Sequence, residues 1–475
     1  MKTRALLPLL LLGACSMAPK YERPATVAIP ASFKEAPGWQ PASPQDAALR
    51  GDWWTLFDDP VLSDLEQRVA RNNQNIAAAV AAYDQARALV KEQRAGLFPT
   101  LTLNTGYTQA GTFGEGETSI VGGSGVVRSG GSKRYEASIG ASWEPDLWGA
   151  VRSAVTQARG EAEASQADIA NTTLSAQGEL ALNYVQLRAI DAQIDLLDAT
   201  TKAYQRALTI TTNRYNQGVA GRIDVLQAET QLRSARADAA DLGRQRAVLE
   251  HAIAVLVGEN PSTFVLAKQP RWTVTVPAVP AILPATLLER RPDIAAAERR
   301  VAAANAAIGI QRAAFFPTIG LSGDVGYQSS ALSDLFKTAS SIWSFGLNGV
   351  MTLLDFGARS ARVTQARAAH EQAVATYRQT VLTAFQNVED QLSAAFILAR
   401  VAEERSAAAV AADRAEQISQ NQYLAGQIGY ADVILQQTTA LSARRTAVTA
   451  QLDRQTAAVA LIQAIGGGWT GSPPR

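Results

Sequence analysis

The chain has 475 residues, of which 44 are basic and 43 acidic, and it contains a single cysteine. A formal net charge of +1 gives no electrostatic basis for binding nucleic acid. One cysteine excludes an internal disulfide, and the length by itself would suggest about three domains of ordinary size.

The N-terminus has the pattern of a cleaved export signal. Two basic residues precede an apolar run from 5 to 12, which is too short to cross a bilayer as a mature helix. The run ends in Leu12-Gly13-Ala14-Cys15, which resembles the bacterial lipobox, whose cysteine is acylated. We therefore expect a lipoprotein signal peptide at 1–14, lipid attachment at Cys15 and an anchored arm at 15–58. The alternative is a chance cysteine after an ordinary signal peptide.

A helix is expected from about 61 to 97, and a pair of short strands follows it. A second pair of strands is expected in the second half of the chain. Runs at about 100–108, 135–144, 318–328 and 343–353 alternate apolar and polar residues with the period of two that is typical of a strand. About ten residues is the length at which a tilted strand crosses a bilayer. The alternative is a soluble four-stranded sheet with one buried face.

Strands that cross lipid would require the chain to assemble with copies of itself. Four strands cannot close a barrel, and an open sheet edge in lipid leaves backbone groups unsatisfied. The side chains predicted to face lipid are Leu101, Leu103, Tyr107, Ile139, Trp143, Leu321, Tyr327, Phe345 and Leu347.

Two further stretches are far longer than the helices of an ordinary globular core. Residues 149–214 and 357–422 contain no proline and carry apolar side chains at steps of three and four. At 1.5 Å per residue, about 65 residues make a helix of roughly 100 Å, which implies coiled-coil-like packing. Each stretch ends at a glycine-containing turn, from which we expect a shorter helix to return.

The second half of the chain repeats the first. Phe98-Pro99-Thr100 recurs 218 positions later at 316–318, and the motif at 155–159 recurs 208 positions later at 363–367. Motifs in a fixed order at two steady offsets indicate an internal duplication in which one loop differs by ten residues. The predicted divisions are repeat 1 at 59–260, a proline-rich linker or collar at 261–290, repeat 2 at 291–468 and a C-terminal tail at 469–475.

No motif for catalysis or for a cofactor is found in the sequence. The two histidines, His251 and His370, are far apart, and neither has a metal-ligand partner at usable spacing. A nucleophile motif, a phosphate loop and a dinucleotide fingerprint are all missing. We therefore expect no enzymatic activity, no cofactor and no metal.

The lipobox, the duplicated order of helix, strand, strand, helix and helix, and the turns with glycine and aspartate together resemble the TolC-type outer-membrane factors, and above all their NodT-like lipoprotein branch. Further matching stretches are Trp53–Pro60, Glu289–Ile294 and Gly466–Trp469. The resemblance covers nearly the whole mature chain. It implies a mainly α fold with a β-barrel part: a homotrimer whose twelve-stranded transmembrane barrel is continuous with a long periplasmic α-helical barrel.

The resemblance also implies a function. Such proteins are passive, gated outer-membrane channels of tripartite efflux pumps, which export small molecules such as drugs and toxic compounds. The implied partners are a periplasmic adaptor (membrane fusion) protein and an inner-membrane pump of the resistance–nodulation–division type. The alternatives are a type I protein secretion channel and a lipid-anchored trimeric coiled-coil protein with a structural or adhesive role.

Members of this family close the tunnel at the periplasmic tips, with a ring of acidic side chains and a latch between a tyrosine and an aspartate. By position, Asp432 would supply the ring, and Tyr423 and Asp224 would form the latch. Leu435 stands where some members carry a second aspartate, so an apolar ring would lie beneath three carboxylates. The alternative for both aspartates is N-capping of the helix after the turn. The glycines expected at the adaptor-contacting tips are Gly218, Gly221, Gly426 and Gly429.

Overall fold

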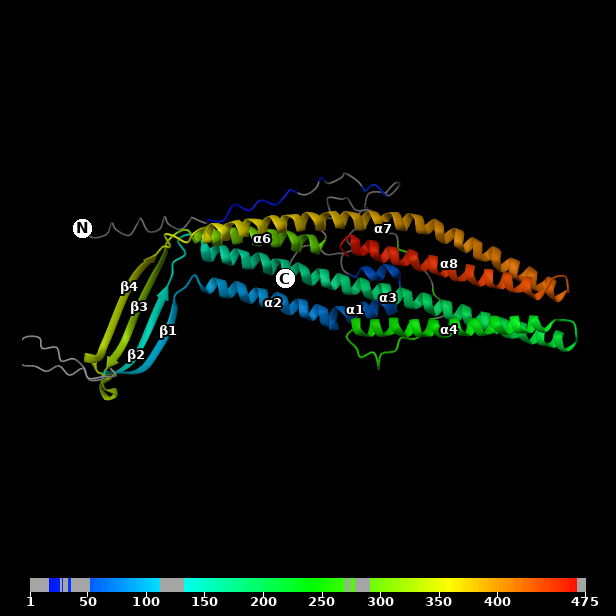
Figure 1. Ribbon diagram of the computed structural model, residues 1–475, viewed down its shortest axis with the longest axis horizontal. Coiled ribbons are helices and arrows are strands. Elements are labelled where there is room, and N and C mark those ends of the chain that lie inside the picture. The colour runs from blue at the N-terminus through cyan, green and yellow to red at the C-terminus, as the bar shows by residue number, and fades with distance from the viewer. Residues whose placement is uncertain are drawn as a thin grey trace, which may run out of the picture. The chain divides into compact units, whose positions relative to one another are not determined.

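The computed structural model describes residues 17–25, 28, 33–35, 52–111, 132–269, 272, 275–277 and 291–467 (Figure 1). Cys15, the signal peptide and the C-terminal tail therefore lie outside the described residues. Among the helices in these ranges, none is both long and apolar enough to span a membrane.

The chain divides into two compact units, and each unit takes segments from both halves of the sequence. Unit 1 comprises Met1–Pro24, Asp84–Glu163 and Arg299–Val374. Unit 2 comprises Ala25–Tyr83, Ala164–Glu298 and Ala375–Arg475. The repeats are thus interleaved in space and do not form separate domains.

Unit 1 contains a four-stranded antiparallel sheet (Figure 1). Its strands are β1 (Thr100–Ala110), β2 (Ser132–Trp143), β3 (Thr318–Ser329) and β4 (Ser341–Val350), in the order β1-β2-β3-β4. Two short 3₁₀ helices, η4 (Leu332–Asp334) and η5 (Thr338–Ser340), lie between β3 and β4. Strand β4 was expected to end at about residue 353, and it ends at Val350. The reason is that β3, with which β4 pairs, begins at Thr318, the residue opposite Val350.

One face of the sheet is apolar and largely uncovered. Leu103 lies opposite Ile139, Ile139 opposite Val325, and Val325 opposite Trp343, so one apolar row crosses all four strands. Each of these side chains except Ile139 is more than 60% exposed. The other face carries polar side chains and glycines at the alternate positions, as the period of two requires.

The helices of unit 1 belong to α2 (Gln74–Ala95), α6 (Pro292–Ala313) and the first parts of α3 (Ala150–Asn216) and α7 (Ala358–Leu424). Helices α3 and α6 pack closely: a Cβ atom at Gly160 would lie only 3.0 Å from the Cβ atom of Ala303. Arg299 of α6 also pairs with Glu163 of α3 at 3.1 Å. Close backbone approach of this kind needs the small residues that the sequence supplies in these helices.

The first helix of the chain was expected to be continuous from 61 to 97, and this was wrong. The structure has α1 (Pro60–Asn72) and α2, separated at Asn73, whose backbone is extended at φ −66° and ψ 125°. The Oδ1 atom of Asn73 accepts hydrogen bonds from the backbone N–H groups of Asn75 (2.9 Å) and Ile76 (3.2 Å). Asn73 therefore acts as the N-cap of α2, a role in which asparagine is strongly favoured.

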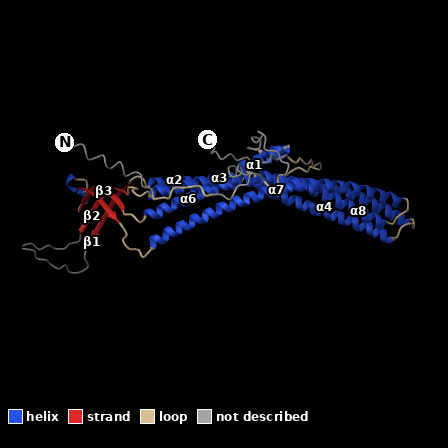
Figure 2. Cartoon of the chain, turned by 90° about the horizontal axis from the view of Figure 1, so that it is seen from above, coloured by secondary structure: helices blue, strands red, loops and turns tan. Residues whose placement is uncertain are grey.

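Unit 2 contains two helical hairpins (Figure 2). In the first, the rest of α3 is followed by α4 (Arg222–Leu256), and in the second α7 is followed by α8 (Tyr430–Ala464). Both long helices have 67 residues and both return helices have 35. Helices α4 and α8 lie side by side, and α1 and the 3₁₀ helix η3 (Trp53–Phe57) also belong to this unit.

A buried ionic network holds the segment after α4 against the first hairpin. Asp191 of α3 accepts hydrogen bonds from Arg188 (2.9 Å), from Arg246 of α4 (2.7 Å) and from the backbone N–H of Gln269 (3.2 Å). Arg246 also donates to the carbonyl oxygen of Leu266 at 2.6 Å. Since the Asp191 side chain is only 1% exposed, its charge is stabilised by these partners rather than by water.

Replacing Asp191 by alanine would leave two buried guanidinium groups without their shared carboxylate. We expect the free energy of unfolding to fall by about 3–5 kcal/mol, measured by thermal or denaturant unfolding of the purified protein in detergent. Asp241→Asn is the matched control, because Asp241 also pairs with an arginine of α4, Arg244 at 2.8 Å, but on the surface. If Asp191→Ala lowers the free energy of unfolding no more than the surface substitution does, the buried network does not stabilise the fold.

Glu66 is a carboxylate in an apolar setting. It lies on the buried face of α1 with Leu62, Leu65 and Val69, and it is fully buried. Neither carboxylate oxygen has a hydrogen-bond partner among the described residues. Burial raises the pKa of Glu66 well above its ordinary value, because the charged form is not solvated there.

This raised pKa makes a prediction about stability and pH. Below the pKa of the unfolded chain both states are protonated, and Glu66 has no pH-dependent effect. Above it the unfolded state ionises while the folded state does not, so stability falls by up to about 1.4 kcal/mol per pH unit until the folded pKa is passed. Glu66→Leu should therefore raise the unfolding midpoint, and more at pH 8 than at pH 5. Asp64→Asn on the exposed face of α1 is the control, and a pH-independent gain for Glu66→Leu would contradict the assignment.

Candidate functional site: the hairpin tips

The two hairpins of unit 2 end in turns with the same hydrogen bonds. In the first, Val219 N–H donates to the carbonyl of Arg214 at 2.9 Å, and in the second Gln427 N–H donates to that of Gln422 at 2.9 Å. The N–H groups of Gly218 and Gly426 donate to the carbonyls of Tyr215 (2.9 Å) and Tyr423 (3.0 Å). Together these bonds form the Schellman motif that ends a helix. It requires a left-handed residue, and Gly218 and Gly426 have φ values of +71° and +74°.

The return helices begin with a glycine followed three residues later by an aspartate. Gly221 is the N-cap of α4, and its backbone N–H donates to the Asp224 carboxylate at 3.3 Å. Gly429 is the N-cap of α8, and its carbonyl accepts from the Asp432 N–H at 3.3 Å. Asp224 thus has a capping role and is half-buried, whereas the Asp432 side chain is exposed.

Tyr423 lies in an apolar cluster between the hairpins. It is only 6% exposed, and its ring centroid lies 5.3 Å from that of Tyr430. Ala207, Ala228 and Val433 complete the buried part of the cluster. Because Ala207 comes from α3, Ala228 from α4 and Tyr423 from α7, the cluster joins both hairpins at their tips.

Arg214 of α3 is the polar partner of Tyr423. Its Nη1 atom donates to the Tyr423 carbonyl at 3.2 Å, and its guanidinium carbon lies 4.7 Å from the centre of the Tyr423 ring. The distance and the ring contact are those of a cation–π interaction, which gains strength when the pair is desolvated. A cation of one hairpin is therefore bound to an aromatic ring and a carbonyl of the other.

The Tyr423 hydroxyl is buried and has no hydrogen-bond partner in the part of the chain that the structure describes. The structure places Asp224 and Tyr423 at the same tips, but no hydrogen bond joins them within this chain. The pKa of Tyr430 is raised to about 12, mainly by burial and to a smaller extent by the nearby Tyr423, Tyr204 and Asp224. This phenol is therefore neutral at physiological pH. The latch of Tyr423 and Asp224 stays a prediction.

Arg214 and Tyr430 were missed by the sequence reasoning, which followed positions where the repeats agree. At the 208-residue offset Arg214 corresponds to Gln422, and Tyr430 corresponds to Arg222. The tyrosines that the repeats share have different surroundings, since Tyr215 is 40% exposed and Tyr423 is buried. The signal in the sequence that could have identified Arg214 and Tyr430 was therefore the difference between the two repeats at these positions.

The outer surface of the tips is apolar. Val219 and Ile223 are each 63% exposed, Leu424 is 53% exposed and Leu435 is 61% exposed. Leu435 follows Asp432 by one helical turn, so a carboxylate and an apolar side chain lie in sequence along the start of α8. Exposed apolar side chains gathered at the end of a hairpin are typical of a surface that contacts another protein.

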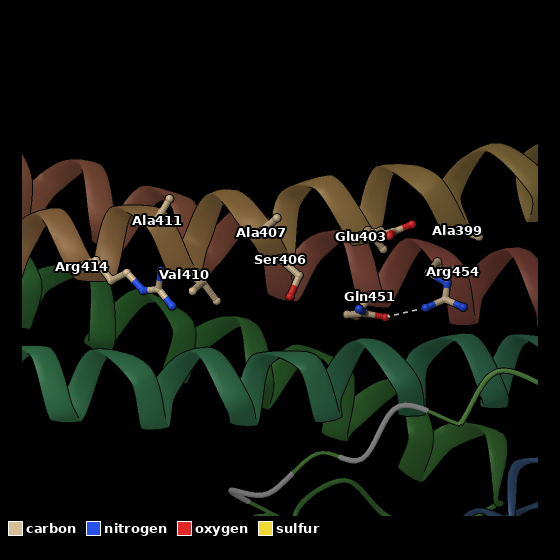
Figure 3. A pocket seen from close by; sticks show the side chains of 10 residues that line it. Ala399, Glu403, Ser406, Ala407, Val410, Ala411, Arg414, Gln451 and Arg454 are labelled. Atoms are coloured by element: carbon tan, nitrogen blue, oxygen red, sulfur yellow. Dashed lines mark hydrogen bonds between the residues drawn. The ribbon is translucent and has the colours of Figure 1, made fainter.

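An open groove of about 650 Å³ lies further along the second hairpin (Figure 3). It is lined by small side chains of α7 and by three charged side chains, Glu403, Arg414 and Arg454. Arg454 donates to Gln451 of the same helix at 3.1 Å, as the dashed line shows (Figure 3). In the described part of the chain, no group of three or more histidine, cysteine, aspartate or glutamate residues could hold a metal ion. Within the described residues, the hairpins therefore offer exposed apolar tips, a link between Arg214 and Tyr423, and an open groove.

Comparison with known proteins agrees with this geometry. The chain is 31% identical over 471 residues to the solvent efflux pump outer membrane protein SrpC of Pseudomonas putida, covering 99% of this chain and 98% of that protein. It is 30% identical over 463 residues to the pyoverdine export outer membrane protein OpmQ of Pseudomonas aeruginosa, covering 97% and 95%.

A solved structure is equally similar. The open state of the MtrE outer membrane channel of Neisseria gonorrhoeae superposes with a TM-score of 0.82 at 30% identity, covering 96% of this chain and 99% of that one. A family model described as outer membrane efflux protein matches residues 65–259 and 283–467, which is most of the chain. The chain therefore belongs to the outer membrane efflux protein family and is an outer-membrane component of an efflux pump.

Proposed function

We propose that three copies of this chain close into one channel, which meets a periplasmic adaptor and an inner-membrane pump and conducts small molecules outward without an energy source of its own. The observation that carries this proposal is the sheet of unit 1, which has an exposed apolar face and two open edges.

The open edge strands support the assembly with further copies, and the number three is the one that the family resemblance implies. Strands β1 and β4 each pair on one side only, with β2 and β3. In the hydrocarbon core of a membrane no water is available to the unpaired N–H and C=O groups, and each costs several kcal/mol. Pairing β4 of one copy with β1 of the next removes both edges, and three copies supply twelve strands in the antiparallel order that the chain already has.

The lipid anchor is the next part of the proposal. The side chain of Asn305 on α6 donates to the carbonyl of Pro19 at 2.9 Å, so the arm is bound in unit 1, the unit that contains the sheet. Cys15 stands four residues before Pro19. An acylated Cys15 would therefore enter the same membrane as the strands, and its acyl chains would add to the anchoring.

We assign the gate to the hairpin tips. The pair of Arg214 and Tyr423 links the two hairpins of one chain, and Asp432 with Leu435 lies on the exposed side of α8. In a ring of three chains these two positions would supply three carboxylates and an apolar constriction. The other exposed apolar side chains of the tips, with Gly218, Gly221, Gly426 and Gly429 in their turns, are the surface that we assign to the adaptor.

The cargo is set elsewhere in the pump. One relative is named for solvents and another for export of pyoverdine, although both match this chain over almost its whole length. We therefore propose that a pump of the resistance–nodulation–division type selects the small molecules that leave through this channel.

The assembly can be tested by charge placed on one face of β4. Phe345→Arg puts a cation on the apolar face, where it should cost about 2–4 kcal/mol per chain at mid-membrane depth, whereas Ser344→Arg puts it on the polar face. We expect Ser344→Arg to keep the high-mass band of unboiled membrane extracts and the efflux of a fluorescent dye. Phe345→Arg should lose both. Loss with both variants, or with neither, would contradict the lipid-facing assignment.

The gate can be tested at Arg214. Arg214→Gln installs the residue that the second repeat has at this position and removes the cation from the Tyr423 ring. We expect a higher open probability in planar bilayers, because the gate that we propose loses a half-buried cation–π contact worth about 1 kcal/mol. Tyr215→Phe, at the exposed tyrosine, is the control and should leave conductance unchanged. Unchanged conductance of Arg214→Gln would remove this contact from the gate.

A further inference from the structure

We propose that a partly enclosed cavity in unit 2 binds a primary ammonium group on a short alkyl chain. The cavity has a volume of about 110 Å³ and lies where η3 meets α1, with side chains of α3 and α8 in its wall. None of the residues that line it belongs to the hairpin tips or to the sheet. The inference therefore does not depend on the proposed trimer, the gate or the adaptor surface.

The segment between η3 and α1 places two consecutive carboxylates at the cavity. The ring of Trp53 packs edge to face on the rings of Trp54 and Phe57, with centroids 5.9 and 6.3 Å apart, and all three side chains are buried. This aromatic cluster holds η3 in place, and η3 ends at Asp58. Asp58 and Asp59 therefore follow a packed element, and both line the cavity.

The two carboxylates have different partners. Asp59 caps α1, because its Oδ1 atom accepts hydrogen bonds from the backbone N–H groups of Val61 (2.9 Å) and Leu62 (3.2 Å). Its Oδ2 atom accepts a hydrogen bond from the Tyr184 hydroxyl at 2.6 Å. The Asp58 carboxylate, by contrast, is exposed and has no hydrogen bond or ion pair with the described residues. Its charge is therefore available to a ligand.

A buried amide oxygen supplies a second acceptor. Gln455 of α8 lines the cavity and is only 4% exposed. Its Nε2 atom donates to the carbonyl of Thr275 at 3.3 Å, which sets the orientation of the amide. The Oε1 atom is buried and has no hydrogen-bond partner in the described part of the chain. A buried acceptor without a donor is unfavourable, and a ligand that donates to Oε1 would satisfy it.

The rest of the wall is apolar and suits a short alkyl chain. Phe57, Tyr184 and Trp272 contribute aromatic rings, and Leu62 and Val185 contribute methyl groups. Aromatic rings attract cations, and the methyl groups pack on apolar carbon. Since a cavity of about 150 Å³ holds a benzene molecule, this one has room for roughly four or five non-hydrogen atoms.

The charges around the cavity favour a cation over an anion. The Arg188 guanidinium lies 4.8 Å from the centre of the Tyr184 ring, but it is bound to Asp191 at 2.9 Å and to the carbonyl of Ala267 at 2.8 Å. Arg188 is thus already paired, and the charge of Asp58 is left without a partner among the described residues.

A primary ammonium group matches this set of acceptors. It carries one positive charge and three N–H donors, for the Asp58 carboxylate and the Gln455 Oε1 atom. A hydroxyl has one donor and no charge, and a guanidinium has five donors, which is more than this wall has free acceptors. Both a free alkylamine and the lysine side chain of another protein end in this group, and the two sources can be told apart by experiment.

Binding of n-butylammonium to the purified protein in detergent tests the site. We expect saturable binding of one molecule per chain by isothermal titration calorimetry at constant ionic strength. Asp58→Asn removes the charge and Gln455→Leu removes the buried acceptor, so each should weaken binding at least tenfold. Asp52→Asn is the matched control, because Asp52 is an exposed aspartate at the other end of η3 without a side-chain capping bond, and it should leave the affinity unchanged.

Two analogues separate charge from hydrogen bonding. 1-Butanol has the same chain without the charge and should show no saturable binding. Butyltrimethylammonium keeps the charge but has no N–H donor, and it should bind at least tenfold more weakly than n-butylammonium. Equal binding of the two cations would overturn the assignment of the acceptors. The unfolding temperature of unliganded Asp58→Asn should equal that of the parent, since this carboxylate has no bond within the described fold; this variant decides the test if Gln455→Leu is unstable.

A capped tripeptide of glycine, lysine and glycine identifies the source of the ammonium group. If the peptide binds and Asp58→Asn weakens its binding at least tenfold, the site accepts a lysine side chain of another protein. If only n-butylammonium binds in this way, the ligand is a free alkylamine. Absence of saturable binding by both probes, or binding that Asp58→Asn leaves unchanged, would overturn the proposal.

Discussion

The hydrogen-bond groups at the two edges of the sheet are the constraint on which the rest of this molecule depends. A four-stranded sheet with one apolar face is a stable partner for lipid on that face, but its edges are not. In the assembly that we propose, the chain therefore carries a membrane element that is incomplete alone. The exposed apolar side chains of unit 1 and the nearly uncovered helix α2 are what a single copy of that assembly would leave open.

The duplication is a simple way to meet that constraint. A closed antiparallel sheet needs an even number of strands and equivalent junctions, and a repeated strand pair supplies both. The ten-residue difference between the repeats falls between the paired strands, since β1 and β2 are separated by a longer connection than β3 and β4. Length can change there without changing the register or the face of any strand, because both are set by the alternation within the strands.

The repeats differ where a symmetrical structure would not serve. At the hairpin tips Arg214 and Tyr430 stand at positions whose counterparts are Gln422 and Arg222. One tyrosine of the repeated pair is buried with a cation over its ring, while the other faces solvent. A cation–π contact between hairpins can be broken without breaking either hairpin, because the turns are held by their own backbone bonds. The tip combines stable turns with a weaker link between them, which suits the gate that we propose there.

Elements whose patterns are local could be predicted from the sequence. The alternation of apolar and polar residues indicated four strands and their faces, proline-free runs indicated the two long helices, and Gly218 and Gly426 marked the turns that need a left-handed residue. The tertiary structure decided what depends on residues far apart in the chain: the partnership of Arg214 with Tyr423, the burial of Glu66 and the network around Asp191. It also decided the break at Asn73, whose side chain caps one helix at the end of another. Periodicity reports which face of an element is buried, and only the packed chain brings together the residues that this face meets.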